Sequence, residues 1–401
     1  MKEEVHIFGG GITGLFLAYH HVKQGNLVTL YEENETLGGV IGTKKEREGL
    51  VEQAANGILL TDDIKSMLDD IGLRPVFPKK ASKRRYFWTN QKLSQFPISI
   101  LSGTKLLYSI FLKKLKFDPN LNFEEWGNQM FGSSVTKNII EPALGGIYGT
   151  RLQELHAETI FSKWNGDGKS TIFQEINKHK KETYGTVSFP NGMGDLVSHL
   201  VTYLSPKIKI QTGFTLSNLS QIQTLKGSIR ICISLKKLIP VLGSLLKPEV
   251  IPNLLSISTI TRFGETKLTK KPCFGVLFGK GEGIQALGVL CNSDIFDGRV
   301  KDGFHSETWI YPNLSGFDTK QIESILESDR TKITKQAETA KAIYKTTWEG
   351  VFPAYDRKLF LFNQTLDQIE SDWQKNGLDI KCFGNYRKGI GLRSLFESTM
   401  I

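Results

Sequence analysis

The sequence predicts an α/β protein that combines a parallel-sheet domain, a mixed-sheet domain and a helical insertion. An apolar strand at residues 5–8 runs directly into the pattern Gly9-x-Gly11-x-x-Gly14, and helical spacing follows it. A second apolar strand at residues 27–31 ends in Glu32, and alternation of strand and helix returns at residues 187–235. A strand, a tight glycine turn, a helix and a second strand ending in an acid form the first half of a Rossmann-like domain of the FAD/NAD(P)-binding type.

Each residue of this first unit has a physical role. Gly9 allows the tight turn, Gly11 lets a pyrophosphate approach the backbone, and Gly14 lets the helix pack close to the sheet. The free N–H groups at the helix N-terminus attract phosphates. Glu32 lies 18 residues after Gly14, where a carboxylate can accept hydrogen bonds from a ribose. A glycine-rich turn that serves packing alone is the competing interpretation.

The glycine pair Gly38-Gly39 favours FAD over NAD. It follows the acid Glu32 closely, and it resembles the second half of the flavoprotein dinucleotide motif, in which such a pair lets a loop close over the FAD phosphates. A simple NAD dehydrogenase does not need a Gly-Gly loop there. The alternative is an ordinary surface turn.

Composition describes a globular protein with room for two or three domains. The chain has 401 residues, 39% hydrophobic and 23% charged, and a net charge of +10 spread over scattered lysines. No nucleic-acid-binding motif accompanies this charge, so we expect no nucleic acid partner. The basic surface suits anionic lipid headgroups or an acidic substrate, and a generally basic proteome would also produce it.

The four cysteines, Cys232, Cys273, Cys291 and Cys382, are far apart in sequence and form no C-x-x-C pair. We therefore expect no metal site, no disulfide framework and a reducing compartment. The N-terminus lacks a signal-peptide pattern and no run of 18 apolar residues occurs. These features predict a cytoplasmic location.

The pattern of predicted helices and strands divides the chain into five segments. The helical insertion begins with a strand pair at residues 86–89 and 92–97, and the mixed-sheet part has strands near 258–263, 274–278, 286–290 and 305–310 and a helix near 319–344. The predicted boundaries are 1–78 for the first part of the FAD-binding domain, 79–184 for the helical insertion, 185–236 for the second part, 237–374 for the substrate-binding domain and 375–401 for the third part.

One segment of the insertion, residues 98–117, has the character of an interfacial helix. Apolar residues dominate one side, and Lys113, Lys114 and Lys116 collect at its end. Such a helix can lie in a membrane interface with its lysines at headgroup level, which would place the protein peripherally on the cytoplasmic face of the membrane. Ordinary packing against neighbouring helices is the alternative.

Four further segments, in this order, resemble the protoporphyrinogen oxidase family within the flavin amine oxidase superfamily. The segment at 141–149 looks like the family's Glu-Pro…Gly-x-Tyr element, and 286–293 resembles its Leu-Gly-x-x-x-x-Ser strand. Residues 352–355 match its Pro-x-Tyr element, and 384–398 resemble its C-terminal flavin motif. The matches are weak residue by residue, but they span nearly the full chain.

The resemblance implies a set of FAD contacts. The pyrophosphate would be held by the first glycine turn, the adenosine ribose by Glu32 and the adenine by the backbone of Phe214. The loop after Glu32, a segment on the flavin side and the start of the last helix would complete the site. The implied residues are Gly9, Gly10, Gly11, Ile12, Thr13, Gly14, Glu32, Gly38, Gly39, Val40, Ala55, Asn56, Gly57, Phe214, Asn385, Ile390, Gly391 and Leu392.

The family's reaction is the FAD-dependent oxidation of protoporphyrinogen IX to protoporphyrin IX in haem biosynthesis, with hydride transfer to flavin N5 and dioxygen as acceptor. The resemblance therefore implies an anionic porphyrinogen substrate, dioxygen or another electron acceptor, and a second copy of the chain as a candidate partner. No residue is identified as a catalytic base. Arg84, Arg85 and Arg387 are candidates for substrate carboxylates, although a solvated surface role is favoured for each.

Two departures from the family put the substrate in doubt. Gly42 and Asn56 stand where relatives often have arginine. Another superfamily activity on coproporphyrinogen, an amine or a polyene therefore stays open. So does a mutase-type flavoprotein, and so does a non-catalytic FAD-binding protein.

Overall fold

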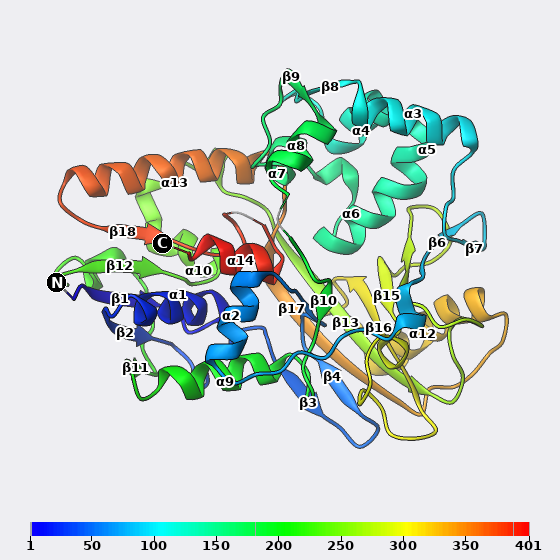
Figure 1. Ribbon diagram of the computed structural model, residues 1–401, viewed down its shortest axis with the longest axis horizontal. Coiled ribbons are helices and arrows are strands. Elements are labelled where there is room, and N and C mark those ends of the chain that lie inside the picture. Colours follow the sequence, from blue (N-terminus) through cyan, green and yellow to red (C-terminus); the bar gives the residue numbers. More distant parts are fainter. Residues whose placement is uncertain (1, 181, 388, 401) are drawn as a thin grey trace.

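A five-stranded parallel sheet forms one end of the molecule (Figure 1). The computed structural model describes residues 2–180, 182–387 and 389–400. The strand order is β11-β2-β1-β12-β18, and every neighbouring pair is parallel. The strands come from three distant parts of the chain: β1 (Glu4–Phe8), β2 (Leu27–Tyr31), β11 (Lys209–Gln211), β12 (Ser228–Ile231) and β18 (Ile380–Cys382).

Helices cover both faces of this sheet, as a parallel sheet requires. The two hydrophobic clusters on its opposite faces are built from different helices. One face is covered by α1 (Ile12–Lys23), α2 (Asp62–Asp70), α9 (Gly194–Leu204) and α14 (Leu392–Ser398), and the other by α10 (Leu235–Leu242) and α13 (Arg357–Lys375). The predicted α/β class with a Rossmann-like domain is confirmed.

A seven-stranded mixed sheet forms the second body of the molecule. Its order is β17-β13-β16-β15-β14-β6-β7, and the β14–β6 pair is parallel while the other neighbours are antiparallel. The strands are β6 (Arg85–Thr89), β7 (Lys92–Ser94), β13 (Leu254–Gly264), β14 (Gly275–Phe278), β15 (Gly288–Leu290), β16 (His305–Pro312) and β17 (Ala342–Pro353). The predicted strand pair of the insertion, β6 and β7, therefore joins this sheet instead of the helical layer.

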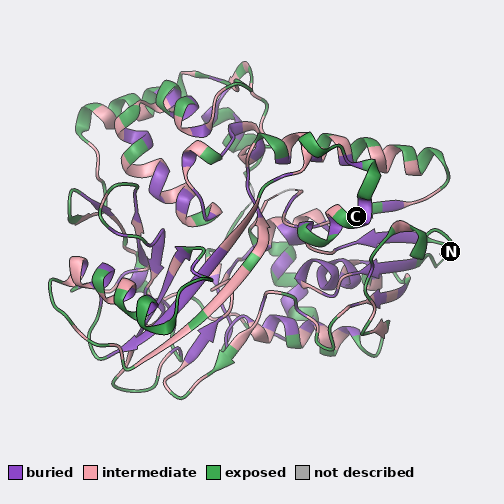
Figure 2. Ribbon diagram, turned by 180° about the vertical axis from the view of Figure 1, so that it is seen from behind, coloured by how far each residue is buried: buried purple, intermediate pink, exposed green. Residues whose placement is uncertain are grey.

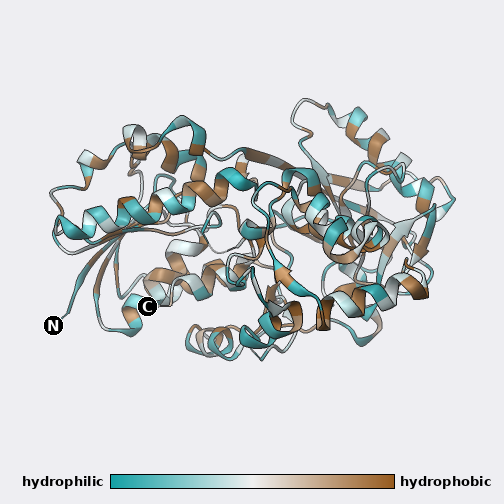
Figure 3. Ribbon diagram, turned by 90° about the horizontal axis from the view of Figure 1, so that it is seen from above, coloured by the Kyte–Doolittle hydropathy of each residue, from teal (hydrophilic) through white to brown (hydrophobic). Residues whose placement is uncertain are grey.

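The helical layer lies above the seven-stranded sheet in Figure 1. It contains α3 (Ile100–Phe111), α4 (Phe123–Phe131), α5 (Ser133–Val135), a π-helical turn (Thr136–Ile140), α6 (Glu141–Tyr148), α7 (Ala157–Ile160) and α8 (Ile172–Lys178), with the strand pair β8 (Lys114–Lys116) and β9 (Asp167–Thr171). Figure 3 views the molecule from the side of this layer and shows hydrophobic stretches among hydrophilic ones.

The predicted helix at 98–117 is shorter than expected. It ends at Phe111, and Lys114 and Lys116 belong to strand β8. Leu115 is fully buried between these two exposed lysines. The alternation of Lys114, Leu115 and Lys116 has the two-residue period of a strand with one buried face. The chain therefore becomes extended here, although an apolar helical segment precedes it.

The predicted helix at 319–344 is wrong in its second half. α12 (Thr319–Thr334) is followed by Lys335, whose φ of 60° is left-handed and ends the helix. Strand β17 then begins at Ala342 and pairs with β13 along most of its length. Residues 342–353 are rich in aromatic and β-branched side chains, which favour an extended strand over a helix.

Two short strand pairs complete the fold around the parallel sheet. β3 (Thr43–Lys45) pairs with β4 (Leu50–Glu52), and β5 (Ile58–Leu59) pairs with β10 (Thr186–Val187). Figure 2 shows buried residues following the strands of both sheets, with exposed residues on the outer helices. In the described part of the chain, no helix combines the length and the apolar character that crossing a bilayer demands.

Candidate dinucleotide-binding site

The first glycine turn is fixed by close backbone contacts. Gly9 has a φ of 106°, and a Cβ built on it would lie 2.7 Å from the carbonyl oxygen of Cys232. A Cβ on Gly14 would lie 1.9 Å from the carbonyl oxygen of Gly9. Both residues must therefore be glycine for β1, β12 and α1 to meet as they do.

Gly11 differs from its two neighbours in the motif because the protein leaves space above it. A Cβ on Gly11 would meet only the Cα of Gly39, at 3.9 Å. Gly38 donates its N–H to the carbonyl of Gly10 at 2.8 Å, so the two glycine loops lie side by side. Packing within the chain does not require glycine at position 11, whereas a ligand approaching the helix N-terminus would.

Glu32 is buried and its carboxylate is held in one orientation. Its Oε2 accepts the N–H of Gly10 at 2.7 Å. Its Oε1 accepts the backbone N–H of Asn34 at 3.0 Å and the side-chain amide of Asn34 at 2.7 Å. A carboxylate oxygen has two lone pairs, so Oε2, which accepts one hydrogen bond, retains acceptor capacity for a ribose hydroxyl, whereas both lone pairs of Oε1 are used.

A pocket of about 690 Å³ extends from these groups across the junction of the two sheets. One side of it has a cluster of aromatic rings, in which Phe8 and Tyr31 stack at 4.5 Å and Phe214 lies 5.1 Å from Tyr31. The far wall comes from β17. The principal lining residues are Phe8, Gly9, Gly11, Tyr31, Glu32, Gly39, Val40, Phe214, Ser234, Lys236, Lys237 and Trp348.

The residues present fit FAD. The space above Gly11 admits a pyrophosphate, Glu32 offers acceptors for a ribose, and apolar walls continue toward the second sheet. A pocket of this volume lies within the usual range for cofactor sites.

The structure brings the predicted FAD contacts together in two groups. In the first group, the residues that line the pocket are Gly9, Gly11, Glu32, Gly39, Val40 and Phe214. A hydrogen bond between Gly38 and Gly10 links the two glycine loops. The buried first turn of α1 consists of Ile12, Thr13 and Gly14.

The second group surrounds the start of α14. One hydrophobic cluster includes Leu392 and Ile12, and Val40 and Ala55 pack against it. Helix α14 contacts both α1 and β5. Gly391 precedes this helix in extended conformation, and its carbonyl accepts the N–H of Leu395. The remaining members of this group, Asn56, Gly57, Asn385 and Ile390, lie in the adjoining loops, outside the residues that line the pocket.

Phe214 can use only part of its backbone for a ligand in this structure. Its N–H donates to the carbonyl of Glu32 at 2.9 Å. The predicted adenine contact therefore narrows to the Phe214 carbonyl and to the aromatic ring that lines the pocket.

Three of the family-like segments meet at a pair of tyrosines. The rings of Tyr148 and Tyr355 lie 4.6 Å apart, and the Tyr355 hydroxyl donates to the carbonyl of Asn385. Burial raises the pKa of Tyr148 to about 12, so this tyrosine stays protonated at neutral pH. The segments at 141–149, 352–355 and 384–398 are thus neighbours in space.

The arginine candidates have other partners. Arg387 forms ion pairs with Asp367 at 2.6 Å and Glu370 at 3.3 Å. Arg85 lies over the ring of Phe274, and Arg84 donates to the carbonyl of Ala81. These contacts give each arginine a local structural role.

The absence of arginine at position 42 has a structural explanation. A Cβ built on Gly42 would lie 2.2 Å from Oε1 of Gln53, so the Gln53 side chain occupies the space that a larger residue would need. Asn56 is half-buried. Both positions are therefore uncharged, and neither lines the pocket.

Several pocket residues were not predicted from the sequence. Lys236 and Lys237 lie in the first turn of α10, the helix that follows strand β12 at the carboxyl edge where parallel sheets bind ligands, and this position was the available signal. Trp348, whose indole N–H donates to the carbonyl of Gln53 at 2.8 Å, lies on the unpredicted strand β17.

Reasoning from the sequence also missed a buried ion pair between Glu52 and Arg299. Arg299 contacts Glu52 at 3.1 Å and donates to Ser188. Burial raises the pKa of Glu52, although Thr43 and Arg299 act in the opposite direction. The two charged residues are 247 positions apart, so no local pattern indicates the pair.

Two of the cysteines that are far apart in sequence lie close together in the structure. Cys273 and Cys291 are 18 residues apart, yet their sulfur atoms lie only 3.4 Å from each other. The short strands β14 and β15 run antiparallel between them and bring the two positions together.

The chain is similar to known proteins over most of its length. Residues 7–71 match the model of an NAD(P)-binding Rossmann-like domain. The chain is 24% identical to protoporphyrinogen oxidase 2, chloroplastic/mitochondrial, of Arabidopsis thaliana, over 97% of this chain and 91% of that protein. It is 28% identical to coproporphyrinogen III oxidase of Bacillus subtilis, over 48% of this chain and 45% of that protein.

Solved structures show the same fold over the full chain. A protein from Exiguobacterium sp. 255-15 named as a protoporphyrinogen oxidase has a TM-score of 0.78 at 16% identity, covering 100% of this chain and 97% of that one. Reduced UDP-galactopyranose mutase has a TM-score of 0.76 at 13% identity, covering 100% and 94%. Putrescine oxidase bound to putrescine has a TM-score of 0.65 at 12% identity, covering 100% and 98%.

Fold, site and relatives together define an FAD-dependent oxidoreductase. The predicted resemblance to protoporphyrinogen oxidases is confirmed over nearly the full chain.

Proposed function

We propose that this protein oxidises a porphyrinogen in haem biosynthesis, with protoporphyrinogen IX as substrate and dioxygen as electron acceptor. The observation that supports this most is the pocket that begins at the glycine turn and ends at β17 of the second sheet. It occurs in a chain that resembles a protoporphyrinogen oxidase over 97% of its length. When bound, FAD supplies the redox chemistry, accepting hydride equivalents from the porphyrinogen and returning electrons to dioxygen.

The residues of the chain bind and position the cofactor. The N–H groups at the start of α1 contact the pyrophosphate, and Glu32 accepts hydrogen bonds from the ribose. Val40, Ala55 and Leu392 contribute apolar surface near the second group of predicted contacts and exclude water from it. No side chain is assigned as a base.

Protoporphyrinogen and coproporphyrinogen differ in charge, with two and four propionate groups. Gly42 and Asn56 lie outside the residues that line the pocket, so these two positions give no preference between the substrates. The matching coproporphyrinogen III oxidase of Bacillus subtilis keeps that substrate as the second candidate.

The test is anaerobic mixing of purified protein with protoporphyrinogen IX while the flavin absorbance is followed. Rapid bleaching, followed by porphyrin fluorescence when air is admitted, is the expected result. Coproporphyrinogen III and putrescine are mixed in parallel at the same concentration. Faster bleaching by either of these would move the assignment to that substrate. A flavin spectrum that none of the three changes would contradict the oxidase proposal and favour a non-catalytic FAD protein.

We also propose that α3 places the protein on the cytoplasmic face of a membrane. Large apolar side chains project from it and from the segment before it, with Ile100 90% exposed and Phe96 74% exposed. Leu101, Leu107, Tyr108 and Leu112 are also exposed, and Lys105 and Lys114 lie among or beside them. An apolar face bordered by lysines suits an anionic lipid surface.

Co-sedimentation with vesicles tests this placement. We expect binding to vesicles that contain phosphatidylglycerol, and weaker binding to vesicles of phosphatidylcholine alone. The double variant Ile100→Asp/Leu101→Asp should lose binding, whereas Ile176→Asp, a change at an exposed apolar residue of α8, should retain most of it. Dimerisation of the wild type that the double variant abolishes, without vesicle binding, would show instead that this face pairs two copies.

A further inference from the structure

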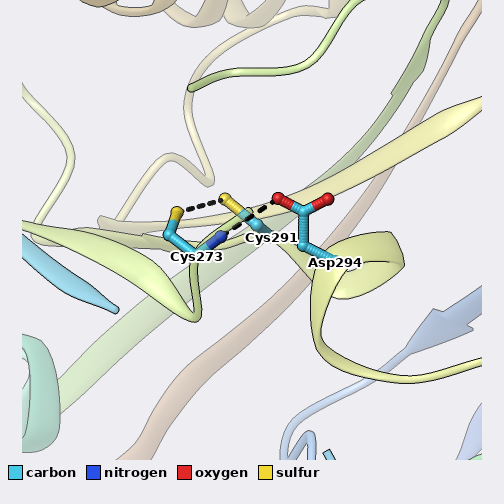
Figure 4. A group of neighbouring side chains, drawn as sticks. All are labelled: Cys273, Cys291 and Asp294. Atoms are coloured by element: carbon cyan, nitrogen blue, oxygen red, sulfur yellow. Dashed lines mark hydrogen bonds between the residues drawn. The ribbon is translucent and has the colours of Figure 1, made fainter. Parts of the chain in front are cut away.

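Two cysteines and an aspartate converge inside the seven-stranded sheet, away from the proposed FAD pocket (Figure 4). Cys273 precedes β14, Cys291 follows β15, and Asp294 lies in the short helix α11 (Asn292–Ile295). Their exposed fractions are 0%, 5% and 7%. One ligand atom from each residue lies within 4.8 Å of the other two.

The strand register explains why the group forms. Gly275 of β14 is paired with Leu290 of β15, so the end of one strand lies beside the start of the other. The N–H of Cys291 donates to the carbonyl of Phe274, which extends this pairing by one residue. Both cysteine side chains then point into the same space, as Figure 4 shows.

Neighbouring groups hold the third member in place. The N–H of Cys273 donates to Oδ2 of Asp294 at 3.2 Å. The ammonium of Lys267 lies 3.4 Å from Oδ1 of the same carboxylate. The Thr269 hydroxyl donates to the sulfur of Cys273 at 3.4 Å. The carboxylate is therefore fixed beside the two sulfur atoms.

We propose that Cys273, Cys291 and Asp294 form a binding site for a thiophilic divalent metal ion such as Zn²⁺. Zinc binds thiolate sulfur at about 2.3 Å in tetrahedral geometry, which separates two sulfur ligands by about 3.8 Å. The observed separation of 3.4 Å is close to this spacing. Carboxylate oxygen is also a zinc ligand, and water would take the fourth position.

Charge balance favours an ion of this kind. Two thiolates and one carboxylate have three negative charges, and a divalent ion with Lys267 supplies three positive ones. Thiolate ligands select zinc over the hard ions magnesium and calcium. Because the group lies in the core cluster of the seven-stranded sheet, the ion would join β14, β15 and α11 and would stabilise the fold.

Metal analysis of the full-length, tag-free protein tests the site. The protein is purified without chelators, dialysed against zinc-free buffer and analysed by mass spectrometry of the elements. We expect about one zinc ion per chain in the wild type and nearly none in Cys273→Ser and Cys291→Ser. Asp294→Asn should weaken zinc binding about tenfold or more. Cys382→Ser changes a buried cysteine of the other sheet and should keep the zinc.

Cobalt substitution keeps the test valid where a serine variant does not fold. Wild-type protein stripped of metal and loaded with Co²⁺ should show the absorption of thiolate-to-cobalt charge transfer, and Mg²⁺ should not displace the ion. Absence of this band would overturn the proposal. Zinc contents that do not differ between wild type and Cys273→Ser would overturn it too, as would a Cys273–Cys291 disulfide in protein alkylated during purification.

Discussion

The two sheets of this protein differ in what fills the space at their edges. At the carboxyl edge of the parallel sheet, Gly11 leaves a free volume beside the buried acceptor Glu32. Between α12 and the seven-stranded sheet, charged side chains are buried instead. Arg262 and Arg330 are almost fully buried there and contact the carboxylates of Glu307, Glu327 and Glu338. The glycines and the acid of the candidate ligand site can thus be identified in the sequence, whereas the cluster of buried charges becomes visible only in the folded structure.

The largest loss of stability is expected for Arg330→Ala. Arg330 lies 3.2 Å from Glu307 and 2.9 Å from Glu338, and both Arg330 and Glu307 are buried. Removal of the arginine leaves a buried carboxylate without its partner, which costs about 3–5 kcal/mol of unfolding free energy. Urea denaturation measures it. Lys375→Ala, which removes an exposed pair with Asp372, is the control and should change little. Equal losses of unfolding free energy in Arg330→Ala and Lys375→Ala would contradict the structural role of the buried charge cluster.

Gly14→Ala should damage the parallel sheet and the FAD site together. The added Cβ would lie 1.9 Å from the Gly9 carbonyl oxygen, so α1 must move away from the turn. We expect a loss of about 1–3 kcal/mol and a several-fold lower flavin-to-protein absorbance ratio. Gly103→Ala is the matched control, since a Cβ there meets nothing within 4 Å. An unchanged flavin content would contradict the assigned role of the turn.

Glu32→Gln tests the acceptor role with a smaller change. The amide keeps the shape of the carboxylate but removes its charge, and its NH₂ group replaces either Oε2, which accepts from Gly10, or Oε1, which accepts from Asn34. FAD affinity should fall about tenfold, equivalent to about 1.4 kcal/mol. Glu35→Gln, at an exposed position three residues later, should leave the dissociation constant of FAD as in the wild type. Fluorescence titration of the apoprotein gives both values.

The two sheets should also lose stability in different pH ranges. Burial lowers the pKa of His20 and of His21, both on α1, from 6.5 to about 4. The folded state therefore favours their neutral forms, and this contribution is present above pH 6.5 and lost as the pH falls toward 4. His20→Phe keeps the contact with Phe396 and should flatten the fall in unfolding free energy over this range. His179→Gln, an exposed change, should not.

In the seven-stranded sheet the corresponding range lies lower. Burial alone would raise the pKa of Glu338, but the Thr266 hydroxyl, the N–H of Glu265 and the two buried arginines lower it to about 2. Its contribution is present above the ordinary value of 4.5 and is lost between pH 4.5 and 2. Peptide-resolved hydrogen exchange, corrected for intrinsic rates, should show α1 opening at a higher pH than α12. The reverse order would refute this difference.

The predictable parts of the molecule are those whose signals are local. The turn from Gly9 to Gly14 and the acid Glu32 indicate the parallel sheet within one short stretch, and the structure brings them to one pocket. Strand β17 was not found because its aromatic residues follow a helical pattern with no proline or glycine between them. Glu52 and Arg299, and likewise Cys273 and Cys291, meet through strand pairing between distant segments, which periodicity in a single sequence does not reveal.

The parallel sheet is built from three separate segments of the chain, and this affects when the FAD site can form during protein synthesis. On the ribosome, β1 and β2 emerge first, whereas β11 and β12 follow after some 180 further residues and β18 only at residues 380–382. The wall of the pocket at Trp348 is also made late. The glycine turn is thus translated long before the surface that closes over its ligand. FAD loading should therefore follow translation, so that limiting flavin leaves full-length apoprotein in the cell and not arrested fragments.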